Sequence, residues 1–118
     1  MLVDRTEKEM KHLLFAVFEN SDETKEVIQQ LAEYGINGTV LASTSLRHIL
    51  HSIEEERSLL TLRHLEKMQF EDNTTFYTLL DEDVLEVAQE IIRRETDHFH
   101  KVKGGMFILP VEKYEGSF

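Results

Sequence analysis

The first part of the chain combines two spacings of apolar residues that indicate different secondary structures. Residues 13–18 are continuously apolar, as in a central strand that is covered on both faces. Asn20 or Ser21 then offers the cap of a helix whose apolar side chains recur at helical spacing, and Gly35 suits the left-handed position that ends a helix. Residues 39–44 predict a second, short strand. The pattern therefore predicts a strand, a helix and a strand.

A second copy of this pattern lies near the end of the chain. Residues 74–80 are rich in side chains that favour strands, and Asp81 is a predicted helix N-cap. The helix that follows has the clearest helical spacing in the sequence, carried by Val84, Val87, Ala88, Ile91 and Ile92. Residues 106–111 predict the last strand. Pro110 cannot donate a backbone hydrogen bond, so we expect this strand at an edge of the sheet or running out of it.

The duplication predicts a fold class. Two strand-helix-strand units in one short chain are typical of the α+β, ferredoxin-like βαββαβ fold, in which both helices cover one face of an antiparallel sheet. We expect a single domain over residues 1–118. Alternate residues of 13–18 point to opposite faces and both sets are apolar, so the second sheet face also needs a cover. A homo-oligomer is the simplest cover.

The segment between the two copies, residues 46–70, predicts a helical insertion between strands two and three. Apolar side chains keep helical spacing at Leu46, Ile49, Leu50 and Ile53, and we expect one bent helix or a helical hairpin. Two interpretations remain open. The apolar stripe either binds a partner protein or packs on its own assembly as a lid.

Charge and composition narrow the classes of function. The chain has 118 residues, with 13 basic against 23 acidic side chains and a net charge of −10, which argues against binding duplex DNA or RNA. The longest apolar run is much shorter than the roughly 20 residues that span a membrane. There is no cysteine, so a disulfide framework is excluded. We expect a cytoplasmic protein without membrane insertion.

Candidate chemistry is sparse. The sequence contains no P-loop, no dinucleotide fingerprint and no nucleophile elbow, so we expect neither an enzyme nor a cofactor. His48 and His51 share a helix face with Glu54 and Glu55, which would suit a divalent metal, but no third histidine is in register. A solvated helix face is the simpler interpretation, and we predict no metal site.

Three short motifs resemble the PII family of signal-transduction proteins, particularly its divergent branch that includes cyclic di-AMP receptors. They are residues 41–44 (Leu-Ala-Ser-Thr), residues 73–75 (Asn-Thr-Thr) and residues 105–112 (Gly-Met-Phe-Ile-Leu-Pro-Val-Glu). The resemblance implies a homotrimer of ferredoxin-like subunits, with a small ligand such as a nucleotide bound in clefts between subunits. It also implies that ligand binding changes the segment between strands two and three, which then contacts a protein partner.

From this resemblance and from the nearby cations we predict a ligand set and a partner-binding set. The ligand set comprises Ser43, Thr44, Arg47, Asn73, Thr74, Lys103, Gly104 and Gly105. The partner-binding set comprises Leu46, Ile49, Leu50 and Ile53. Two alternatives remain open: a protein-interaction module without a ligand, and a metal-binding trimer of the CutA type.

Overall fold

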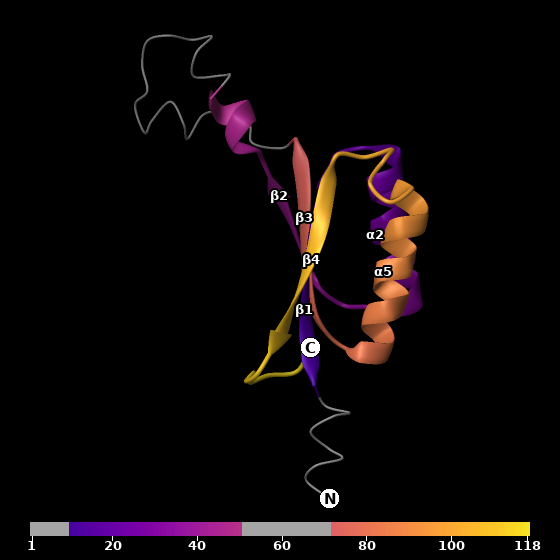
Figure 1. Cartoon of the computed structure of the whole chain (residues 1–118), viewed down its shortest axis with the longest axis vertical. Helices are drawn as coiled ribbons and strands as arrows, with labels where there is room; N and C mark the ends of the chain where they lie inside the picture. The colour runs from indigo at the N-terminus through magenta and orange to yellow at the C-terminus, as the bar shows by residue number, and fades with distance from the viewer. Residues whose placement is uncertain (1–9, 51–71) are drawn as a thin grey trace, which may run out of the picture.

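The computed structural model describes residues 10–50 and 72–118, which form a four-stranded antiparallel sheet and two long helices (Figure 1). The elements, in chain order, are β1 (Lys11–Glu19), α2 (Asp22–Tyr34), β2 (Thr39–Ser43), β3 (Asn73–Asp81), α5 (Glu82–Thr96) and β4 (Gly104–Val111). Residues 46–50 are also helical. The strand order is β2-β3-β1-β4, and each neighbouring pair is antiparallel. The α+β class predicted from the sequence is confirmed.

Helix ends follow the predicted capping residues. The Ser21 hydroxyl accepts a hydrogen bond from the Thr24 amide at 3.1 Å, so Ser21 rather than Asn20 caps α2. Gly35 ends the same helix with φ 96°, a left-handed conformation that glycine adopts without steric cost. Asp81 caps α5 by accepting from the Val84 amide at 3.0 Å. Residues next to each helix in the sequence therefore determine where both helices begin and where α2 ends.

The core lies between the sheet and the two helices, on the face that carries Leu14, Ala16 and Phe18 of β1. These three side chains are fully buried. The helices bury Val27 and Leu31 from α2, and Leu85, Ala88, Ile91 and Ile92 from α5. In Figure 1 both helices lie on the same side of the sheet. The spacing predicted for α5 is confirmed at Ala88, Ile91 and Ile92, while Val84 and Val87 are only partly buried and the buried Leu85 was not predicted.

The last strand is longer than the sequence predicted. β4 begins at Gly104 and not at Met106, because both glycines continue the ladder and lie opposite Phe18 and Val17 of β1. Backbone pairing needs no side chain, so the residue types at these two glycines did not indicate a strand. The expectation for Pro110 is confirmed, since β4 is an edge strand.

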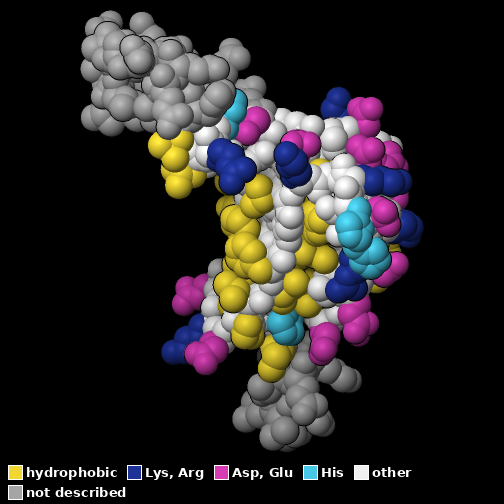
Figure 2. All heavy atoms as spheres, turned by 45° about the horizontal axis from the view of Figure 1, so that its top comes forward, with side chains coloured by type: hydrophobic (Ala, Val, Ile, Leu, Met, Phe, Trp, Pro, Cys, Tyr) yellow, Lys and Arg dark blue, Asp and Glu magenta, His cyan; other side chains and the backbone are white. Residues whose placement is uncertain are grey.

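The opposite face of the sheet is apolar and largely uncovered in the described part of the chain. We call it the open face, and its residues are Leu13, Phe15, Val17, Leu41, Tyr77, Leu79, Phe107 and Leu109. Phe107 and Leu109 are 52% and 50% exposed. The Phe15 ring stacks on that of Phe107, with centroids 4.9 Å apart. Figure 2 shows hydrophobic side chains gathered in a band along the sheet.

No helix within residues 10–50 and 72–118 combines the length and the apolar character needed to cross a lipid bilayer. Most of the predicted 46–70 insertion, including Ile53, lies outside the described residues.

Candidate functional site

A hollow of about 540 Å³ lies at the end of the sheet where β1 finishes. Because β1 is antiparallel to both of its neighbours, its last residues meet the first residues of β3 and β4. The segment that follows β2 closes the hollow from another side. Its walls are Val17 and Glu19, Ser45, Arg47 and His48, Asp72 and Asn73, and Lys103 and Gly104. Four segments distant in sequence thus converge at one point.

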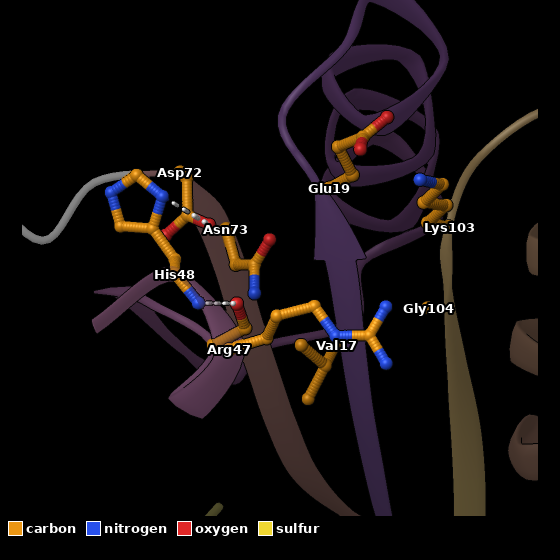
Figure 3. A pocket seen from close by; sticks show the side chains of 9 residues that line it. Val17, Glu19, Arg47, His48, Asp72, Asn73, Lys103 and Gly104 are labelled. Atoms are coloured by element: carbon orange, nitrogen blue, oxygen red, sulfur yellow. Dashed lines mark hydrogen bonds and ion pairs between the residues drawn. The ribbon is translucent and has the colours of Figure 1, made fainter. Parts of the chain in front are cut away.

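Ser45 fixes the conformation of the wall that follows β2. Its hydroxyl accepts a hydrogen bond from the His48 amide at 3.0 Å, and its carbonyl accepts from the Ile49 amide at 3.2 Å. This is the arrangement of a helix N-cap. It directs the His48 imidazole toward Asp72, with Nδ1 and Oδ2 4.0 Å apart (Figure 3). The hollow is therefore in contact with the first residues of the insertion and with the segment that follows it.

At the β4 wall of the hollow, the backbone of Gly104 lies very close to the backbone of Val17. A Cβ atom there would lie 1.9 Å from the Val17 carbonyl oxygen, and φ is 145°. The Glu19 amide donates to the Lys103 carbonyl at 2.8 Å. Only glycine allows this approach, which places the Lys103 side chain at the rim of the hollow.

The hollow gathers two cations in a chain that is strongly acidic. Figure 3 shows Arg47 reaching across Val17 toward Gly104, while Lys103 enters from the β4 side. Glu19 and Asp72 supply opposite charge at the rim. The Asp72 Oδ1 atom is buried and has no hydrogen-bond partner among the described residues. Arg47 and Lys103 suit the anionic part of a ligand, whereas the Glu19 and Asp72 carboxylates suit a hydrogen-bond donor on the same ligand.

Four residues of the predicted ligand set line this hollow, namely Arg47, Asn73, Lys103 and Gly104. The other four do not. Ser43 instead shares a hydrogen bond with Thr75 at 2.8 Å, and Thr74 donates to Asn20 at 2.6 Å on the helix side. The Thr44 hydroxyl is buried without a partner in the described part. Gly105 lies opposite Val17, and open space surrounds the position of its missing side chain.

Five lining residues were absent from the predicted set: Val17, Glu19, Ser45, His48 and Asp72. Val17 and Glu19 belong to β1, and only the strand register shows that β1 ends at this hollow. The sequence does hold a signal for Ser45, because a serine three residues before His48 is a typical N-cap spacing.

The remaining candidates are only partly described. Leu46 and Leu50 of the predicted partner-binding set are 75% and 50% exposed, and Ile49 is half-buried. His51, Glu54 and Glu55 lie outside the described residues. Among residues 10–50 and 72–118, no group of three or more metal-ligating side chains comes together.

Comparison with known proteins supports the fold and leaves function open. No protein-family model and no curated protein matches the chain. The chain is similar in structure to a functionally unknown protein from Pediococcus pentosaceus ATCC 25745, with a TM-score of 0.58 and 16% sequence identity, covering 92% of this chain and 98% of that one. A likeness at this identity shows a shared α+β fold.

Proposed function

We propose that the chain is a PII-like regulatory protein that forms a homotrimer, binds a small anionic ligand in the hollow and signals to a protein partner. One observation carries the proposal. Arg47, Asn73, Lys103 and Gly104, expected together from the resemblance and from the nearby cations, line one hollow although they come from three separate segments. The strand order β2-β3-β1-β4 with both helices on one face supports a ferredoxin-like topology for the subunit.

The open face supports the homotrimer. Its exposed apolar side chains span the sheet, from Leu41 on β2 and Tyr77 on β3 to Phe107 and Leu109 on β4. Single soluble subunits seldom leave a large contiguous apolar patch in water. None of the eight residues of the open face is charged, so contact between two copies through them would bury mainly apolar groups. Val17 belongs both to this face and to the hollow, which therefore lies beside the proposed subunit interface.

The position of the hollow supports a signalling mechanism. His48 belongs to the segment that enters the insertion, and Asp72 to the segment that leaves it. A ligand that contacts these side chains favours one arrangement of the two segments over others. Such a difference in affinity between conformations is what a ligand needs in order to shift a population. The exposed Leu46 and Leu50 side chains offer the contact for a partner.

Calorimetry tests the ligand part of this proposal. We expect one of cyclic di-AMP, ATP, ADP or AMP to bind, and Arg47→Ala and Lys103→Ala each to weaken that binding about tenfold because each removes a charge-assisted contact. Lys101→Ala is the matched control, since Lys101 is an exposed cation two residues from Lys103 that does not line the hollow.

The same experiment decides between the proposal and its alternative. If none of the four nucleotides binds more tightly than about 1 mM, which corresponds to roughly −4 kcal/mol, the ligand sensor is rejected. The exposure of Leu46 and Leu50 then favours a protein-interaction module without a ligand.

A further inference from the structure

The β2 strand leaves one edge of its backbone unpaired. It stands at the end of the sheet and, within the described residues, pairs with β3 alone. A free strand edge presents a row of N–H and C=O groups that another strand can bind. Natural edge strands are usually protected by lysine, proline or a bulge. The five residues of β2, Thr-Val-Leu-Ala-Ser, contain no charge and no proline.

A groove runs beside this edge on the helix side of the sheet. Its volume is about 650 Å³, and it lies between β2 and α2. Lys25, Ile28 and Gln29 form its helix wall at a spacing that places them on one side of α2. Val40 of β2 is 49% exposed on the strand side, so α2 does not cover it. The groove thus has apolar surface at Ile28 and Val40.

The geometry of an added strand matches this groove. Side chains of neighbouring strands alternate between the two faces in register, so every second residue of a strand paired to β2 would share the face of Val40. Those residues would lie over the groove. A helix bound in the groove would leave the β2 backbone groups unsatisfied, and for this reason a strand fits the surface better.

The charge of the groove indicates which kind of peptide it prefers. Lys25 is its only charged lining residue, and no carboxylate lines it, although the chain has 23 acidic residues. We propose that β2 and α2 form a docking groove for an extended segment of a partner protein, which adds a strand to β2, places an apolar side chain against Ile28 and Val40, and carries an acidic residue toward Lys25. The residues that line the groove belong to neither the ligand hollow nor the open face, although Leu41 of the same strand lies on the open face.

A backbone-methylation scan tests the binding mode. Peptides selected from a random display library against the full-length protein would be resynthesised with one N-methyl group at each position in turn. Strand addition predicts a period of two, because only amides that face β2 lose a hydrogen bond on methylation. In ¹⁵N spectra we expect the amide signals of Thr39 to Ser43 to shift on peptide addition. A scan without this alternation overturns the proposal.

Variants test the two side-chain contacts. Val40→Glu should weaken binding of the selected peptides at least about tenfold, because it places a charge on the apolar strand side of the groove. Lys25→Glu should change the selected motif from acidic to basic residues. Lys113→Glu makes the same charge change at an exposed site outside the groove and should leave the motif unchanged. Circular dichroism confirms that each variant is folded.

Two further outcomes would reject this inference and leave the proposed function untouched. A library that yields no binding peptide shows that the edge does not accept a partner strand. The second outcome is that the protein self-associates without peptide and Val40→Glu abolishes this self-association while nucleotide binding persists. This result would assign the groove to contact between copies of this chain.

Discussion

At the scale of single residues, the two adjacent glycines before the last strand have different roles. Gly104 has a positive φ and lies against the Val17 carbonyl, where no side chain fits. At Gly105 a Cβ would meet nothing within 4 Å. The sequence shows two glycines in a row, and only the fold shows which of them is required.

We expect Gly104→Ala to lower the free energy of unfolding by about 3 kcal/mol, from backbone strain together with the clash against Val17. Gly105→Ala, the neighbouring control, should change it by less than about 0.5 kcal/mol. Urea denaturation of the two variants measures both values. Equal effects would contradict the assignment of strain to Gly104.

The turn after α5 could not be predicted from its residues. Asp97, His98 and Phe99 all have positive φ, although none is glycine. The buried Thr96 hydroxyl holds this turn, donating to the Ile92 carbonyl at 2.6 Å and accepting from the Phe99 amide at 3.0 Å. A left-handed segment stabilised by one internal hydroxyl has no signature in composition or spacing.

At the scale of elements, the sequence predicted the helix boundaries but not the register in which the strands pair. Gly35 and Asp81 were identified as helix boundaries, and Ser21 was one of two candidates, because each acts on its own neighbourhood in sequence. Arg47, Asn73 and Lys103 were chosen partly through family resemblance. Glu19 and Asp72 were missed, because their approach depends on how strands pair across the sheet.

The helical residues 46–50 give a prediction at this scale. Leu50 is half exposed in the subunit, so Leu50→Ala should lower the free energy of unfolding by less than about 0.5 kcal/mol. The same change at Leu31, which is buried in the core, should cost about 2–5 kcal/mol. Thermal melts compare the two variants. A large loss at Leu50 would show that the stripe packs within the assembly and is not kept for a partner.

At the scale of the whole molecule, the open face is the basis of the proposed assembly. The doubly apolar pattern of residues 13–18 predicted that a second face would need a cover, and the structure shows that α2 and α5 cover the first face alone. The pattern could not show that the aromatic rings of three strands would align, since Phe15, Tyr77 and Phe107 become neighbours only through register.

Replacing Phe107 tests assembly without disturbing the subunit core. Phe107 is 52% exposed, so Phe107→Asp should leave the subunit folded but convert a trimer to monomers, because a charge cannot be buried unpaired between apolar faces. Tyr34→Asp is the control, because it replaces an exposed aromatic residue of α2 outside the open face, and it should leave the trimer intact. Sedimentation velocity measures the masses. A monomeric wild-type protein at micromolar concentration would reject the trimer.

The position of β1 in the sheet constrains the order in which the chain can fold. Its register joins Lys11 to Val111 and Phe18 to Gly104, so the central strand completes its pairing only with residues made far later in synthesis. Contacts between such distant residues slow folding, and nascent β1 lacks its β4 neighbour until the end of synthesis. We therefore expect the emerging chain to need protection on the ribosome until β4 is available, a vulnerability that the finished subunit retains only at its open face.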